Sequence, residues 1–169
     1  NQFLIATSRD EAKVGTIGAD SQYYQEWKDT APVPLADVQA ELSRPHLTSQ
    51  HKLIAGMLRP AHLLDIIRHF TLFMPITGKL IKVVCRYQQF RAVQYATQRL
   101  LHGRTKAEDG EHDRRGGIIW HTQGSGKSLT MVFLVRKLRS IPELRRFKIV
   151  IVTDRKDLEK QLSETAALS

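Results

Sequence analysis

Five consecutive residues carry the clearest chemistry in this sequence: Gly124-Ser125-Gly126-Lys127-Ser128. Glycine adopts the positive backbone φ angles that a tight turn requires, and successive N–H groups of such a turn can point into one concavity. A lysine ammonium beside that concavity can bind phosphate oxygens, and a serine hydroxyl can bind Mg²⁺. These residue types, in this order, are typical of a phosphate-binding loop.

The residues around the loop agree with this interpretation. Ile118-Ile119-Trp120 precedes it as a short apolar strand, and the apolar run from Leu129 to Val135 predicts a helix over residues 127–139. The strict phosphate-loop pattern begins with glycine, whereas this sequence has His121 at that position. A flexible basic linker is the alternative, but its flanks would be polar.

A second apolar strand is predicted over Phe147–Thr153, and a helix from Lys156 to about Leu168 follows it. Strand, helix and strand together predict a parallel βαβ unit with a right-handed crossover. Asp154 is the acid nearest to such a strand. It is either the Mg²⁺ carboxylate of a compact phosphate-loop kinase or NTPase, or part of a Thr-Asp-Arg turn with another role. Arg155 would compete for the carboxylate, which favours the second interpretation.

The earlier part of the chain predicts three segments. Residues 1–30 begin with a short β-hairpin, and an aromatic helix is expected near Tyr23–Lys28. Residues 31–80 follow a proline-containing linker signal and are mainly helical, with one apolar stripe running from Pro60 to about residue 74. Residues 81–169 contain most of a strand at 80–85, an amphipathic helix from Arg86 to Leu101, and the phosphate loop. The fold class is therefore α/β.

Composition and charge indicate the cellular setting and the kind of partner. The chain has 169 residues, of which 41% are hydrophobic, and no apolar stretch approaches the length of a membrane span. Its single cysteine, Cys85, cannot form an internal disulfide, which favours a reducing cytoplasmic setting and a buried structural thiol. The net charge of +9 falls within residues 81–169, because residues 1–80 balance to zero. Clustered cations of this kind suggest a nucleic-acid partner, and a solvated basic face is the alternative.

Several blocks resemble one known family, the restriction (R) subunit of type I restriction endonucleases. They are Trp120–Met131, Val150–Gln161, Arg86–Val93 and, less specifically, Asn1–Thr7 with Val14–Ile17 and Glu26–Lys28. Members are superfamily 2 helicase-like translocases, and His121 is usual at its position. The resemblance implies a partial RecA-like domain whose motif I binds ATP and Mg²⁺. Its residues here are Thr122, Gln123, Gly124, Ser125, Gly126, Lys127, Ser128 and Leu129.

The resemblance also implies roles for single residues. Lys127 and Ser128 would be the catalytic pair, with Ser128 as the Mg²⁺ ligand. Gln89, or Gln88 as second choice, would recognise adenine, because a carboxamide offers a donor and an acceptor together; a solvated helix glutamine is the alternative. Thr153 and Arg155 would fall in motif Ia, which lies along the DNA backbone.

By the same resemblance, the partners are double-stranded DNA and the modification (M) and specificity (S) subunits, with no membrane, in a bacterial or archaeal cytoplasm. The nuclease core and the acidic motif II would lie outside this sequence. We therefore expect a fragment that spans the nuclease–motor junction (1–30), a helical linker (31–80) and the first part of the motor (81–169), and that is inactive alone. A non-catalytic DNA-binding module with an empty loop is the remaining alternative.

Overall fold

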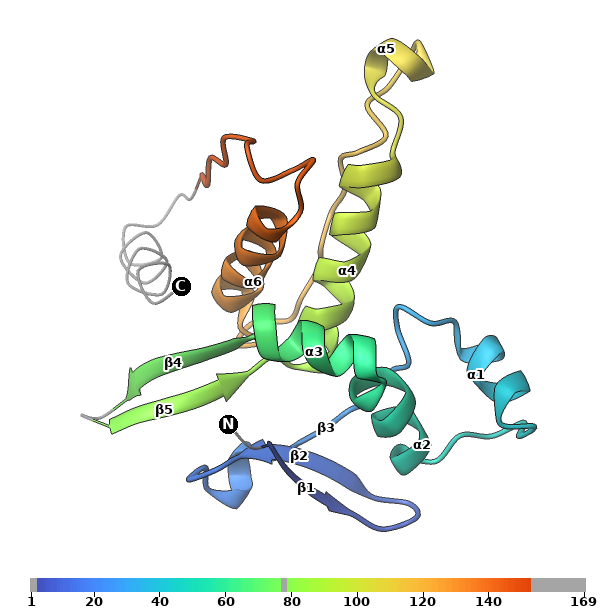
Figure 1. Ribbon diagram of the computed structural model, residues 1–169, viewed down its shortest axis with the longest axis vertical. Coiled ribbons are helices and arrows are strands. Elements are labelled where there is room, and N and C mark those ends of the chain that lie inside the picture. Colours follow the sequence, from blue (N-terminus) through green and yellow to red (C-terminus); the bar gives the residue numbers. More distant parts are fainter. Residues whose placement is uncertain (1–2, 77–78, 153–169) are drawn as a thin grey trace. The chain divides into compact units, whose positions relative to one another are not determined.

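The computed structural model describes residues 3–76 and 79–152 (Figure 1). The chain divides into two compact units, residues 1–90 and 91–169. It is a mixed α/β protein, as expected. Among the described residues, no helix has the length and apolar character needed to cross a membrane.

The N-terminal unit begins with a three-stranded antiparallel sheet of order β1-β2-β3. Strands β1 (Phe3–Thr7) and β2 (Ala12–Thr16) form the predicted hairpin, with Ile5 opposite Val14, and β3 (Gln25–Glu26) pairs with β2. The aromatic helix expected near residues 23–28 is wrong. A 3-10 turn at Ser21–Tyr23 leads instead into β3, because residues 25 and 26 gain pairing with β2.

Helices follow in the same unit. They are α1 (Leu35–Glu41), α2 (Ser49–Leu53), a π-helical turn (Ile54–Leu58) and α3 (Pro60–His69), which begins at Pro60 as predicted. The expectation that α3 runs to residue 74 is wrong. Strand β4 (Thr71–Ile76) starts there and pairs with β5 (Lys79–Val84) along its whole length. A short apolar run fits either structure, and here pairing decides.

Aromatic rings build the core of this unit. Phe90 is fully buried, and its ring centroid lies 5.0 Å from Phe70 and 5.7 Å from both Trp27 and His62. The Thr16 hydroxyl donates to the Lys82 carbonyl at 2.8 Å and so ties β2 to β5. Cys85 is the predicted buried thiol, and its burial raises its pKa well above the usual range.

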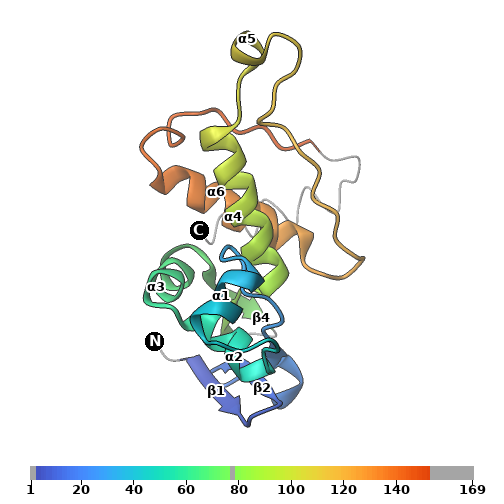
Figure 2. The same ribbon diagram turned by 90° about the vertical axis from the view of Figure 1, so that its right-hand side faces the viewer.

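Helix α4 (Tyr87–His102) matches the prediction and continues into the C-terminal unit. The short helix α5 (Lys106–Asp109) lies beyond its end, and the chain then returns along α4 (Figures 1 and 2). Two hydrogen bonds fix this return: Arg114 N–H to the Arg104 carbonyl at 2.8 Å, and Arg99 Nε to the Gly116 carbonyl. Helix α6 (Lys127–Ser140) follows the glycine-rich loop, as predicted.

The two expected parallel strands are not strands in this structure. Residues 118–120 and 147–152 have no ladder partner among the described residues, and Trp120 is 80% and Val152 90% exposed. A strand requires a neighbour for its N–H and C=O groups, and parallel strands are normally covered on both faces. One strand followed by one helix supplies neither the neighbouring strand nor a cover for both faces. The described residues therefore show no parallel βαβ unit, and Thr153 and the helix expected after it lie outside them.

Candidate phosphate-binding site

The loop before α6 has the backbone conformation that its glycines predict. Gly124 has φ 74° and Gly126 has φ 81°, both in the left-handed region. A Cβ on Gly124 would meet no atom within 4 Å. Glycine is therefore required there by the backbone angle rather than by space.

A tight turn holds the loop together. The Ser125 hydroxyl donates to the Thr122 carbonyl at 2.7 Å, and Ser125 N–H donates to the same oxygen at 3.3 Å. Ser125 is only 5% exposed. On the other side, the Thr130 hydroxyl and N–H both donate to the Gly126 carbonyl. The loop is thus fixed at both ends, and Gly126 stands directly before the first residue of α6.

The N-terminus of α6 is left open, unlike those of two other helices. Thr48 with His51 caps α2, and Thr105 with Glu108 caps α5. No side chain caps α6, and no acidic residue lies in its first turn. The first N–H groups of a helix need acceptors, and in the described part of the chain those of Lys127, Ser128 and Leu129 have none. These donors and the helix dipole suit a phosphate group.

Two cations lie near the loop. Burial is the main cause that lowers the pKa of His121, and the charges of Lys127 and Arg91 lower it further. Both cations therefore disfavour the charged form of His121 and add positive charge near the loop. Sequence reasoning missed Arg91, because it stands far from the loop along the chain and no motif marks it.

Comparison with known proteins identifies the family of this chain. A family described as SWI2/SNF2 ATPase matches residues 88–169. The type I restriction enzyme HindI endonuclease subunit of Haemophilus influenzae is 38% identical over 98% of this chain. The chain belongs to the type I restriction enzyme endonuclease subunits. The predicted family resemblance is thereby confirmed.

Other relatives carry the same name. The putative type I restriction enzyme MjaIXP endonuclease subunit of Methanocaldococcus jannaschii is 36% identical over 95% of the chain. The SsaAORF53P endonuclease subunit of Staphylococcus saprophyticus is 30% identical over 63% of it, and the chain covers 10% of that relative. This endonuclease-subunit chain spans 15% of the HindI subunit and 16% of the MjaIXP subunit. No solved structure matches it.

The two candidate adenine-binding glutamines differ in this endonuclease-subunit chain. Gln89 is 2% exposed, and its Oε1 accepts a hydrogen bond at 2.8 Å from the N–H of Arg86, the residue before α4. Gln89 is the third residue of α4, so this bond is half of a capping box. Gln88 is half-buried and keeps more of its surface open. The structure thus shows Gln89 bonded within the chain, and a role in adenine recognition stays a prediction for both glutamines.

The remaining predicted residues have less structural support. Thr153, Asp154 and Arg155 lie outside the described residues, so their roles stay predictions. Among the described residues, no three His, Cys, Asp or Glu side chains gather into a metal site. Protein-bound Mg²⁺ usually takes only one or two carboxylates and otherwise uses phosphates and water. Ser128 is half-buried, and its role as the Mg²⁺ ligand stays a prediction.

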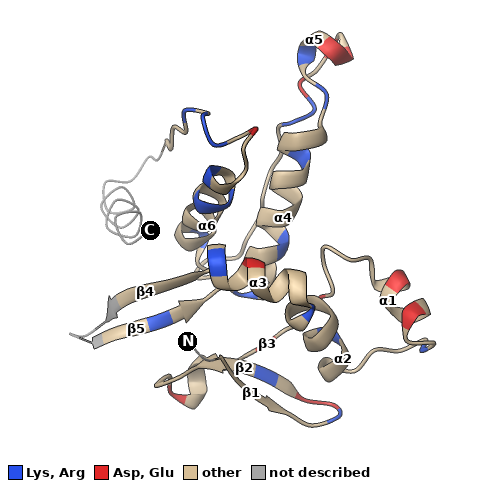
Figure 3. Ribbon diagram, viewed as in Figure 1, with Lys and Arg blue, Asp and Glu red and all other residues tan. Residues whose placement is uncertain are grey.

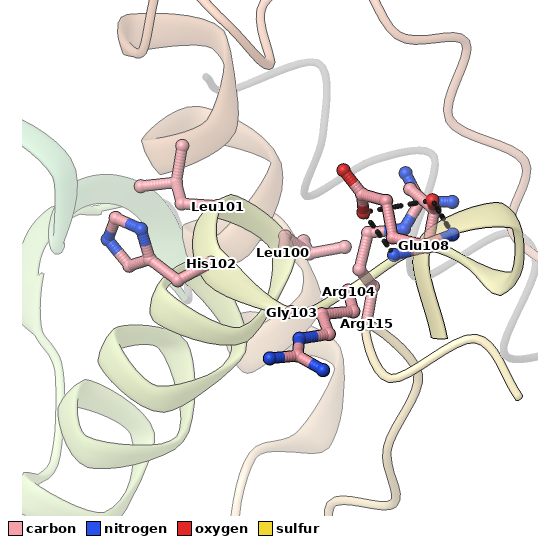
Figure 4. Close-up of a pocket in the computed structure, with 8 residues that line it drawn as sticks. Leu100, Leu101, His102, Gly103, Arg104, Glu108 and Arg115 are labelled. Atoms are coloured by element: carbon pink, nitrogen blue, oxygen red, sulfur yellow. Dashed lines mark hydrogen bonds between the residues drawn. The ribbon is translucent and has the colours of Figure 1, made fainter. Parts of the chain in front are cut away.

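A pocket lies elsewhere in the C-terminal unit, at the end of α4 and around α5 (Figure 4). Its lining includes Arg104 and Glu108, and the Glu108 carboxylate accepts hydrogen bonds from the N–H and hydroxyl of Thr105. These bonds lower the pKa of Glu108 and occupy its carboxylate with helix capping. The pocket contains no phosphate-loop residue.

Proposed function

We propose that this chain is the ATP-binding part of a type I restriction R subunit. In the whole subunit, ATP hydrolysis moves double-stranded DNA, which the subunit then cleaves, in complex with the M and S subunits and in a bacterial or archaeal cytoplasm. One observation carries the proposal. The uncapped start of α6 follows two glycines of positive φ, within the region that matches an ATPase family.

The residues present fit a nucleoside triphosphate with Mg²⁺. Open N–H groups at the start of α6 would bind phosphate oxygens, and exposed Lys127 would add a point charge beside them. Ser128 would hold Mg²⁺, which neutralises charge on the phosphates. Gln88 or Gln89 would contact adenine, and Thr153 and Arg155 would lie along DNA. Residues 118–120 and 147–152 would become parallel strands when further strands cover them.

A nucleotide titration tests the proposal. The 169-residue chain is mixed with a fluorescent ATP analogue and Mg²⁺, and anisotropy gives the dissociation constant. Lys127→Ala should weaken binding at least tenfold, because it removes the charge that faces the phosphates. Lys106→Ala is the matched control, since it removes an equal charge from the exposed first turn of α5.

The possible outcomes separate the alternatives. Binding that Lys127→Ala leaves intact would contradict the proposal and favour a DNA-binding module without nucleotide. A collapse of Mg²⁺-dependent binding in Asp154→Asn would favour a compact phosphate-loop kinase. Robust DNA-stimulated ATP hydrolysis by the isolated chain would contradict the expectation that this segment lacks catalytic parts.

A further inference from the structure

A second basic surface lies at the other end of α6. Residues 136–148 contain six Lys and Arg against one acid, Glu143. Figure 3 shows these cations on the last turns of α6 and on the segment that follows it. We call four exposed members the basic turn: Arg139, Arg145, Arg146 and Lys148.

The basic turn is held in a defined shape. Leu144, 3% exposed, anchors the segment, and its N–H donates to the Ile141 carbonyl at 3.1 Å. Arg139 Nη1 donates to the carbonyls of Arg145 and Phe147, the latter at 2.8 Å. Arg145 and Arg146 directly follow the buried leucine and are exposed. The backbone that carries these cations is therefore held by its own hydrogen bonds.

Among the described residues these cations lack counter-ions, and another charged segment of the same unit shows the contrast. Residues 103–115 carry four cations and four acids, and Arg114 pairs with Asp109 while Arg115 pairs with Asp113. Hydrogen bonds from Arg115 lower the pKa of Asp113 to about 2. Within the described part of the chain, no carboxylate pairs with any member of the basic turn.

The helix dipole does not explain the cluster. Cations in the last turn of a helix complement its negative end, and Arg139 does so. Arg145, Arg146 and Lys148, however, lie beyond the end of α6 at Ser140.

We infer that the basic turn binds the phosphodiester backbone of DNA. This inference rests on the proposed function, and it adds a contact surface separate from the phosphate loop and from the predicted motif Ia. Several unpaired cations gain affinity for a polyanion because they release its condensed counter-ions. Such contacts position DNA without reading its sequence.

The test measures anisotropy of a fluorescein-labelled DNA duplex with the 169-residue chain, over a range of KCl concentrations. The triple variant Arg145→Ala/Arg146→Ala/Lys148→Ala should raise the dissociation constant about tenfold or more and reduce the slope of log K against log salt by roughly two to three. The matched control is Arg9→Ala/Lys13→Ala/Arg44→Ala. It removes three exposed cations from the N-terminal unit and should change affinity less than twofold.

Nucleotide binding by the same preparations separates this inference from the proposed function. If the triple variant binds DNA as the wild type does, or if the control loses as much, the inference is wrong. The same holds if the wild-type chain does not bind DNA at low salt. ATP-analogue binding unaffected by the triple variant and lost in Lys127→Ala would leave the proposed function standing in each case. Circular dichroism confirms that the variants fold.

Discussion

In the N-terminal unit, Trp27, Phe70 and Phe90 are fully buried against one another. In the C-terminal unit, Trp120 is 80% exposed, and Val150 and Val152 are exposed as well. Capping boxes begin α2 in the first unit and α5 in the second, whereas α6 in the second unit has an open N-terminus. Among the described residues, the cations after the end of α6 have no carboxylate partner.

This contrast separates residues that hold the fold from residues available to partners. A buried ring or a satisfied cap contributes to the chain's own stability. An uncapped helix start, an unpaired cation or an exposed apolar segment contributes little to that stability. Each of them can instead contribute to the free energy of binding when a ligand or another strand contacts it. The C-terminal unit is thus where binding is expected, and substitutions can test this division.

The largest effect on stability is expected at Phe90. Phe90→Ala should lower the free energy of unfolding by about 3–5 kcal/mol, because it leaves a cavity among three packed rings. Trp120→Ala removes a larger ring but should change stability by less than about 0.5 kcal/mol, since the ring is exposed. Urea denaturation followed by circular dichroism measures both. Equal losses would contradict the division between the units.

The next largest effect on stability is expected at Gly56, with Gly116 as the comparison. A Cβ on Gly56 would lie 2.1 Å from the Asp29 carbonyl oxygen and 2.4 Å from Trp27 Nε1. Gly56→Ala should therefore cost about 1–3 kcal/mol through overpacking. A Cβ on Gly116 would meet nothing within 4 Å, so Gly116→Ala should leave stability unchanged or raise it by up to about 1 kcal/mol. Thermal unfolding of the two variants side by side would show whether Gly56 is the more sensitive position.

The sequence predicts most clearly those features that depend on neighbouring residues. The β1–β2 hairpin, the start of α3 at Pro60, helix α4 and the loop before α6 all follow from local spacing and from glycine or proline preferences. Gly124 and Gly126 are the plainest case, because their residue type anticipates the positive φ that the structure shows.

Features that depend on distant pairing are less predictable. The run Thr71–Ile76 fits a helix by apolar spacing and becomes β4 because β5 lies beside it. The segment at 147–152 has the composition of a buried strand, but composition supplies no hydrogen-bond partner. The electrostatic influence of Arg91 on His121 joins two residues on separate elements, so no local pattern could reveal it.

Smaller effects are expected at two hydroxyls: that of Thr48 stabilises a helix, and that of Ser128 is predicted to bind Mg²⁺. Thr48→Ala removes the cap of α2 and should cost about 1 kcal/mol, with no change in nucleotide affinity. Ser128→Ala should change stability by less than about 0.5 kcal/mol, because its hydroxyl has no partner among the described residues. It should instead weaken Mg²⁺-dependent nucleotide binding. Titrations with and without EDTA isolate the Mg²⁺-dependent part, and a loss that persists in EDTA would speak against Ser128 as the metal ligand.

The smallest effect is a change in the pKa of His121. Burial and the charges of Lys127 and Arg91 lower this pKa in the folded chain, so the folded state binds the proton less readily than the unfolded state. The contribution to stability is therefore complete above the ordinary histidine pKa of the unfolded state, and it is lost as pH falls below that value and through the lowered pKa of the folded state. A bound nucleotide would offset the charge of Lys127, and the pKa of His121 should then rise. NMR titration of its Cε1 proton measures the rise, and Lys127→Ala should raise the pKa without nucleotide. A pKa that falls or stays constant on nucleotide binding would place the phosphates away from Lys127.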